Sequence, residues 1–240
     1  TGMTGYLEAM TGSDYYGQIL IQTFPMVGNY GVNSEDMDSP RAWVKGYVVR
    51  EYCEHPSNFR CEKTIDQFMK DQNIVGLAGI DTRQLTRILR KKGIMNGMIT
   101  HEDPAPRMST ILATLRGYEI KDSLGQVSTR EVLYYLPKGA SSPEDCKYKV
   151  VVYDFGMKKC QVRSLLSRNC HLIVLPFNTP AKEALSYQPD GIFLSDGPGD
   201  PSSNRELLNT IEELCQSKVP ILGIGMGHQL LAITNGGQTW

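Results

Sequence analysis

The sequence has no long hydrophobic run and no excess of charge of one sign. No apolar stretch approaches the roughly 18 residues that a membrane-spanning helix needs. Lys and Arg total 25 against 26 Asp and Glu, which gives a net charge of -1. A basic surface for nucleic acid or for an anionic membrane is therefore not expected, and small-molecule or protein partners are favoured.

Closely spaced cysteines are also missing. The six cysteines are far apart, without the CxxC spacing of a zinc site or the density of a small disulfide-linked protein; they are Cys53, Cys61, Cys146, Cys160, Cys170 and Cys215. This usage favours a reducing compartment, so we expect a cytoplasmic protein, with an organelle as the alternative. The chain begins with Thr1 rather than Met, so we expect its natural start to lie upstream and its targeting to be unreadable.

The second half alternates short apolar runs with helical patterns, which predicts a parallel sheet covered on both faces. Strands are expected at 150–153, 172–175, 191–194 and 220–224, and helices near 162–166, 181–187 and 207–214. At 240 residues and 40% hydrophobic content, the chain can form two modest domains. We place an α/β domain at 147–240.

The first half, 1–138, has short segments separated by turn residues and reads as a mixed α+β domain. Two helix starts carry a cap residue three positions before a Gln, at Thr64 and Asp81. In the second of these helices we expect apolar residues to face a core, arginines to face solvent and Gly93 to end the helix. The small, polar segment 139–146 is the expected linker.

Three loops that follow predicted strands look chemically active: DFG at 154–156, SDGPGDP at 195–201 and GMGHQ at 225–229. Ligands of open α/β sheets bind outside the carboxyl ends of the strands, so we expect the three loops to share one crevice. The SDGPGDP loop places bare backbone amides next to a bound group, although a surface turn rich in turn residues is an alternative.

The segment GIGMG at 223–227 has the spacing of a nucleophile elbow, in which two glycines flank a catalytic residue on a sharp strand-to-helix turn. Its central residue is Gly225, which has no side chain. A glycine-rich turn without a catalytic role, or one that binds phosphate at the helix start, is about equally compatible with the pattern. His228 falls on the first turn of the helix that follows. It is more simply explained as a packed or capping histidine than as a general base.

Taken together, the motifs resemble the small, glutamine-hydrolysing subunit of carbamoyl phosphate synthetase. The resemblance of the second half, to a class I glutamine amidotransferase domain, rests on the three loops and is shared with other amidotransferases. The first half makes it specific through TGMTGY at 1–6, PMVGNYG at 25–31, SNFR at 57–60, GIDTRQLTRILR at 79–90 and NG at 96–97. The implied fold class is α/β, a mixed α+β domain followed by the first part of a class I amidotransferase parallel-sheet domain.

The resemblance implies that the subunit hydrolyses L-glutamine and passes ammonia to a large synthetase subunit, or fused synthetase domain, for arginine and pyrimidine synthesis. It places the nucleophilic cysteine of the family at Gly225, and it implies that the catalytic His and Glu lie beyond Trp240. Contacts with the substrate or its oxyanion are implied for Gly197, Gly199, Met226 and Gln229. A substrate-contacting serine aligns with Asp14, next to Ser13, and Asp196 replaces a usual Asn.

Glycine cannot attack an amide, so the chain as written is expected to be inactive as a glutaminase. Engineered replacement, natural loss of the chemistry and an error in the sequence remain open explanations. A non-catalytic scaffold for an ammonia-dependent synthetase is the alternative function. No cofactor or metal is expected in this chain, since ATP, bicarbonate and Mg belong to the large partner by resemblance. Restoring Gly225→Cys is expected to recover hydrolysis in a full-length protein but not in these 240 residues.

Overall fold

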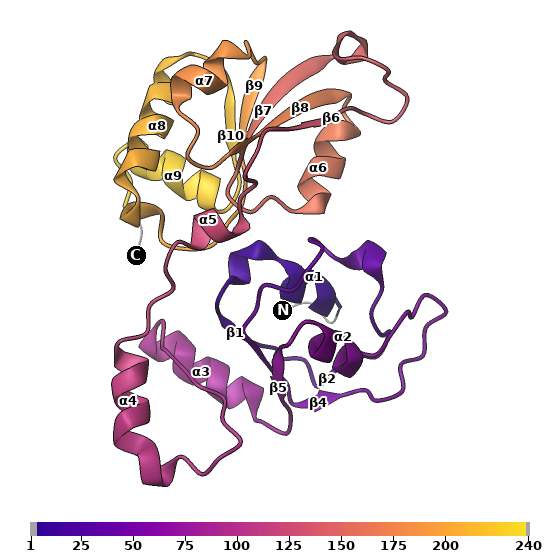
Figure 1. Cartoon of the computed structure of the whole chain (residues 1–240), viewed down its shortest axis with the longest axis vertical. Coiled ribbons are helices and arrows are strands. Elements are labelled where there is room, and N and C mark those ends of the chain that lie inside the picture. Colours follow the sequence, from indigo (N-terminus) through magenta and orange to yellow (C-terminus); the bar gives the residue numbers. More distant parts are fainter. Residues whose placement is uncertain (1–3, 239–240) are drawn as a thin grey trace. The chain divides into compact units, whose positions relative to one another are not determined.

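The computed structural model describes residues 4–238, and the chain divides into two compact units between Lys121 and Asp122. Figure 1 shows the elements of both units with their labels. Within the described residues, no helix has the length and apolar character needed to cross a membrane. Each unit is described by itself below.

The first unit contains two small parallel sheets with helices around them. Its three-stranded sheet has the order β1-β3-β5, and β2 pairs with β4. The buried cluster joins α1 and α2 to these strands and includes Tyr6, Met10, Tyr47 and Phe68. The elements are α1 (Tyr6–Thr11), η1 (Ser13–Tyr15), β1 (Ile19–Ile21), β2 (Met26–Val27), η2 (Ser34–Asp36), β3 (Gly46–Val48), β4 (Glu51–Tyr52), α2 (Ile65–Asp71), β5 (Val75–Leu77), α3 (Thr82–Lys92), η3 (Ala105–Arg107) and α4 (Met108–Arg116).

Helix caps in this unit follow the sequence prediction. Thr64 and Gln67 form a reciprocal capping box at the start of α2, because each side chain accepts the other residue's backbone N–H. At the start of α3, the Asp81 side chain accepts the N–H of Gln84 at 3.0 Å. Gly93 ends α3 with a φ of 81°, where its N–H donates to the Leu89 carbonyl.

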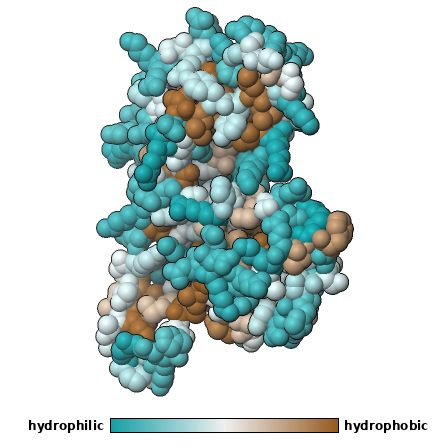
Figure 2. All heavy atoms as spheres, turned by 45° about the vertical axis from the view of Figure 1, so that its right-hand side comes forward, coloured by the Kyte–Doolittle hydropathy of each residue, from teal (hydrophilic) through white to brown (hydrophobic). Residues whose placement is uncertain are grey.

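One expectation for α3 is wrong, because its apolar side does not reach a core. Leu85 and Leu89 are only half-buried, and Ile88 is exposed. Ile94 and Met95, which follow the helix, are exposed as well. Hydrophobic side chains, drawn in brown, reach the surface between hydrophilic ones in Figure 2. The capping signals located the helix correctly, whereas its periodicity overstated its burial.

The second unit is built on a five-stranded sheet of order β10-β9-β7-β8-β6. Its four later strands are parallel, as predicted, because continuous apolar runs suit strands buried on both faces. The elements are α5 (Ser123–Val127), β6 (Leu133–Tyr135), η4 (Pro143–Asp145), β7 (Tyr148–Asp154), α6 (Lys159–Leu166), β8 (Cys170–Pro176), α7 (Ala181–Ser186), β9 (Gly191–Leu194), η5 (Pro201–Ser203), α8 (Arg205–Gln216), β10 (Ile221–Gly223) and α9 (Met226–Thr234).

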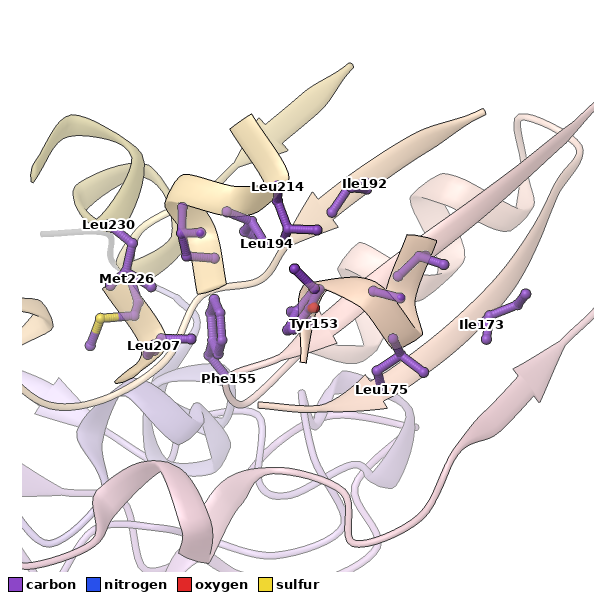
Figure 3. Packing of buried hydrophobic residues seen from close by; sticks show 14 residues of the cluster. Tyr153, Phe155, Ile173, Leu175, Ile192, Leu194, Leu207, Leu214, Met226 and Leu230 are labelled. Carbon is purple, nitrogen blue, oxygen red and sulfur yellow. The ribbon is translucent and has the colours of Figure 1, made fainter. Parts of the chain in front are cut away.

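Helices cover both faces of this sheet, with α6 on one face and α7, α8 and α9 on the other (Figure 1). Alternate residues of a strand point to opposite faces, and accordingly Val151 and Val152 belong to different buried clusters. The larger cluster, seen close up in Figure 3, contains Tyr153 at the end of β7, Phe155 just after that strand, and Met226 at the start of α9. This packing fixes the strand ends that carry the predicted loops.

The expected linker at 139–146 lies inside the second unit and does not separate the two units. It connects β6 to β7, and β6 is an antiparallel strand of the same sheet, paired with β8. The segment is ordered by Asp145, whose Oδ2 accepts the backbone N–H groups of Ser141 at 2.8 Å and Ser142 at 3.0 Å. Its small polar residues therefore build a turn, and the division of the chain lies earlier than the 1–138 boundary we expected.

Strand β10 lies at one end of the sheet and pairs with β9. Among the described residues, no strand pairs with its other side. Leu222 within the strand is 57% exposed, and Ile224 just after it is also exposed. This edge of the sheet is thus apolar and uncovered.

His171 on β8 makes the stability of the second unit dependent on pH. The side chain is buried and stacks on Tyr134, with the ring centroids 6.3 Å apart. Burial, together with the nearby charge of Lys149, lowers the pKa of His171. The neutral ring is therefore favoured in the folded state, and the stability that it contributes is present above the unfolded pKa of about 6.5 and lost as the pH falls through the folded value.

We expect the wild-type protein to lose more unfolding free energy than His171→Phe when the pH falls from 7.5 to 5, because phenylalanine keeps the stacking and cannot be charged. Urea unfolding at several pH values measures this difference. His101→Phe, which removes an exposed histidine, is the matched control. Parallel pH profiles for the wild type and His171→Phe would contradict the prediction.

Candidate functional site

Three strands of the second sheet end side by side. Strands β10, β9 and β7 are adjacent and parallel, so the loops that follow them leave from the same carboxyl-terminal side of the sheet. These loops are the three that the sequence singled out, at 154–156, 195–201 and 225–229. The predicted convergence of the loops is confirmed.

Ser195 ties the three loops together and is fully buried. The N–H of Phe155 donates to Ser195 Oγ at 2.9 Å, and the N–H of Gly227 donates to the Ser195 carbonyl at 3.1 Å. The Ser195 hydroxyl itself donates to the Asp196 carbonyl at 2.9 Å. One residue therefore fixes the spacing of all three strand ends.

Gly225 stands at the turn between β10 and α9 with φ 54° and ψ -112°. This conformation is strained for residues with a Cβ, at a cost of about 1–3 kcal/mol, and glycine relieves the strain. Gly225 is exposed, whereas Met226 next to it is buried. The backbone therefore has the geometry of a nucleophile elbow, with its central position open to solvent and without a side chain.

The flanking glycines allow the strand and the helix to approach closely. A Cβ on Gly223 would lie 2.7 Å from the backbone nitrogen of His228, and a Cβ on Gly227 would overlap the Leu194 carbonyl. A side chain at either position would push α9 away from β10. The glycine spacing is thus explained by packing, independently of any chemistry at Gly225.

Gly197 and Gly199 lie in the loop after β9. A Cβ on Gly197 would overlap the Phe155 carbonyl, so this glycine packs against the neighbouring loop. Gly199 is exposed with a φ of 100°, and the Ser123 hydroxyl donates to the carbonyl of Pro198 beside it at 3.4 Å. The loop is therefore held by the Phe155 carbonyl beside Gly197 and by the Ser123 hydroxyl beside Gly199. The roles of its two glycines in substrate binding remain predictions.

Asp196 holds the backbone N–H groups at the centre of the site. Its Oδ1 accepts the N–H of Gly197 at 2.9 Å and that of Met226 at 3.3 Å. Its Oδ2 lies 3.5 Å from Nζ of Lys158, which follows the loop after β7. The Met226 amide, implied by resemblance to bind an oxyanion, is therefore bonded to a carboxylate of the protein itself.

Lys158 was given no role from the sequence, and Asp196 was noted only as a departure from the family. A usable signal was present for both, since each residue follows a strand whose end forms the site. Gln229 is exposed on the first turn of α9, and its contact with glutamine remains a prediction. Its backbone N–H donates to the Gly225 carbonyl at 3.0 Å.

Asp154 holds the loop after β7 in place through hydrogen bonds from backbone N–H groups. Its Oδ1 accepts the N–H groups of Gly156 at 2.9 Å and Met157 at 2.7 Å, and its Oδ2 accepts that of Thr129 at 2.7 Å. The side chain is 8% exposed, and this burial raises the pKa of Asp154. These contacts indicate a structural role.

Other candidates lie outside this arrangement. Asp14 and Ser13 belong to η1 of the first unit, so the substrate contact implied there remains a prediction. His228 is exposed on the first turn of α9. The described residues contain no group of three or more His, Cys, Asp or Glu side chains that could hold a metal ion.

Comparison with known proteins matches each half of the chain to a family. Residues 1–99 match the carbamoyl-phosphate synthase small chain, CPSase domain, and residues 151–240 match the class-I glutamine amidotransferases. Proteins named carbamoyl phosphate synthase small chain align with all of this chain. Those of Listeria monocytogenes serotype 4b, Clostridium perfringens and Bacillus caldolyticus are 45%, 42% and 43% identical to it.

The chain covers 63%, 65% and 63% of these three relatives, which is slightly less than two thirds of their length. The two matched families occur in the order that the sequence motifs suggested, and the elbow at Gly225 lies within the amidotransferase match. On these grounds the chain is similar along its whole length to carbamoyl phosphate synthase small chains, with a class-I glutamine amidotransferase match in its second half.

Proposed function

We propose that this chain is part of the glutamine-hydrolysing subunit of a carbamoyl phosphate synthetase, with its nucleophile position occupied by glycine. In such a subunit a thiolate attacks the amide of L-glutamine, the amide nitrogen leaves as ammonia, and the resulting thioester is hydrolysed to glutamate. The ammonia then serves the synthetase for carbamoyl phosphate, a precursor in arginine and pyrimidine synthesis. The chain with Gly225 is inactive in this reaction.

The elbow geometry is the observation that carries the proposal. A strand, a glycine at φ 54° and a helix that starts at Met226 reproduce the strand-turn-helix context in which an amidotransferase presents its nucleophile. The flanking loops supply the backbone groups that such a site needs to hold a substrate amide. At the elbow itself, the residue that would carry the attacking atom is glycine.

A second function, a non-catalytic scaffold that lets the synthetase use free ammonia, is favoured by Gly225 itself. The two functions are distinguished with the full-length protein, after its residue 225 has been determined. This protein is combined with the large subunit, and carbamoyl phosphate formation is measured with glutamine or with ammonia. A glutaminase subunit gives carbamoyl phosphate from glutamine and a trapped thioester, whereas a scaffold gives product from ammonia alone. Failure to bind the large subunit would contradict both functions.

The partner surface that we propose is on α3 of the first unit. The helix contains five cations and no carboxylate, namely Arg83, Arg87, Arg90, Lys91 and Lys92. All five are exposed, and none forms an ion pair within residues 4–238. Apolar residues beside them are exposed too, so an acidic surface with an apolar centre on the large subunit or fused synthetase domain would complement this helix.

Reversing three charges with Arg83→Glu, Arg87→Glu and Arg90→Glu is expected to weaken binding of the large subunit by at least about 100-fold, because like charges would then face each other. Titration calorimetry at two salt concentrations measures the loss. The control is the triple variant Arg163→Glu, Lys182→Glu and Lys218→Glu, which changes the charge equally on exposed residues of the second unit. Equal affinities for the two triple variants would contradict the prediction.

We propose no cofactor for this chain and assign ATP, bicarbonate and Mg to the synthetase partner. The substrate L-glutamine and the large subunit are its proposed partners, and neither nucleic acid nor a membrane is among them. We also propose a cytoplasmic location, with an organelle as the alternative, because the widely spaced cysteines favour a reducing compartment.

A further inference from the structure

The Asp196 carboxylate is held by groups from three loops of the second unit. Gly197 from its own loop and Met226 from the loop after β10 donate their N–H groups to Oδ1. Lys158 from the loop after β7 faces Oδ2 at 3.5 Å. The side chains of Asp196 and Lys158 are only about one-fifth exposed, at 20% and 21%.

The carboxylate lies in the space that a nucleophile would occupy. A Cβ built on Gly225 would overlap Asp196 Oδ1 and would lie 3.1 Å from Oδ2. A side chain at residue 225 therefore cannot coexist with the present position of Asp196. The absence of a Cβ at Gly225 provides the space into which Asp196 extends.

The surroundings favour a negative charge at this place. The Met226 N–H is at the start of α9, a nine-residue helix, and the amide dipoles of a helix favour anions there. Hydrogen bonds from amides to a carboxylate are stronger than those to a neutral acceptor. Lys158 adds a positive charge on the other side of the carboxylate. Asp196 is thus bound in the way that the oxyanion of a reacting substrate would be bound.

We propose that Asp196 is an internal anion that fills the oxyanion position of the elbow, and that Gly225 and Asp196 form a coupled pair. While the carboxylate stays in place, the Met226 amide is closed to any ligand, and a thiol at residue 225 would be crowded and repelled. The proposal concerns the elbow alone and holds whichever substrate the protein uses. It goes beyond the loss of the nucleophile, because it names a second residue that keeps the site closed.

Thiol alkylation in the full-length protein tests the coupling without any assay of enzyme activity. Gly225→Cys and Gly225→Cys/Asp196→Asn are treated with iodoacetamide, and peptide mass spectrometry follows the cysteine introduced at residue 225 separately from the native ones. We expect alkylation to be about tenfold faster in the double variant, the change that one pKa unit produces in a mostly protonated thiol. Removing the negative charge stabilises the neighbouring thiolate, and the asparagine, although nearly equal in volume, is held less strongly by the backbone amides and can move aside.

The matched control is Gly225→Cys/Asp200→Asn, which removes a carboxylate from the same loop. The Asp200 carboxylate accepts hydrogen bonds from the N–H and the hydroxyl of Ser202, and within residues 4–238 its side chain forms no hydrogen bond with the elbow at 223–227. Alkylation of this variant is expected to match that of Gly225→Cys. Equal rates with and without Asp196→Asn would overturn the proposal, and so would an equal acceleration by Asp200→Asn.

Folding of the variants is a second readout. A single Gly225→Cys protein that fails to fold, beside a folded double variant, supports the proposal, because it shows that the charged form of Asp196 keeps its place against a side chain at residue 225. Should neither fold, Asp196→Ala with Gly225 retained is compared with Asp200→Ala. Loss of the bonds to the start of α9 is then expected to lower the Tm of Asp196→Ala by about 3–6 °C more. An equal Tm for the two would overturn the proposal.

Discussion

Glutamine hydrolysis is expected to be at least about 100-fold faster in the full-length variant Gly225→Cys/Asp196→Asn than in Gly225→Cys alone. The thiolate restores the nucleophile in both proteins, but only the double variant frees the Met226 amide from a charged competitor. Removing one donor to an oxyanion costs about 10²–10³ in kcat. The neutral amide of asparagine competes less strongly for the Met226 N–H than the negatively charged oxyanion of the substrate does.

Glutamate release, measured with the large subunit present, checks this result, and ammonia-dependent carbamoyl phosphate synthesis shows that the complex is intact. Gly225→Cys/Asp200→Asn is the control and is expected to behave like the single variant. The sequence alone favours recovery by Gly225→Cys, so equal activities of the single and double variants would show that Asp196 does not obstruct the site. Normal glutamine binding without hydrolysis in both would show that more than the nucleophile has been lost.

Asp154→Ala is expected to lower the unfolding free energy of the protein by about 3–5 kcal/mol. Three backbone N–H groups, from Gly156, Met157 and Thr129, donate to this carboxylate at 2.7–2.9 Å. Each buried donor that is left without an acceptor costs about 1–3 kcal/mol, and water entering the space left by the carboxylate recovers part of that cost. The loop after β7 would lose its shape together with these bonds.

Urea unfolding of the second unit measures the loss, followed by a signal such as fluorescence or circular dichroism. Asp190→Ala is the control, because the Asp190 carboxylate accepts a single backbone N–H, from Lys149 at 2.7 Å, in an exposed setting. Its cost is expected to be about 1 kcal/mol or less. A cost for Asp154→Ala below that of Asp190→Ala would contradict a structural role for Asp154.

The parallel part of the second sheet could be predicted because each strand is a continuous apolar run with clear limits. Strand β9 has the bounds that were expected, since Asp190 precedes it and Ser195 follows it. Strand β6 was missed because it has three residues and is largely exposed, so neither length nor alternation distinguishes it. The domain boundary was misplaced for the same reason, since β6 attaches the preceding segment to the second unit.

The location of the site could also be predicted, because the ends of parallel strands meet at one edge whatever their side chains are. The occupation of the Met226 amide by Asp196 could not, since it depends on a side-chain conformation between residues 30 positions apart. The exposure of Ile88 was equally hidden, because an amphipathic pattern shows which side of a helix is apolar and not whether anything covers that side.

The uncovered edge of β10 has a consequence for handling the protein. Among the described residues, no strand pairs with the outer side of β10, and an edge strand with exposed apolar residues such as Leu222 is a template on which another extended chain can add hydrogen bonds. In dilute solution water satisfies the backbone groups of this edge. As the protein concentration rises, hydrogen bonds between the β10 strands of two molecules replace hydrogen bonds to water. Self-association of these 240 residues would then begin at β10, before any loss of folded structure.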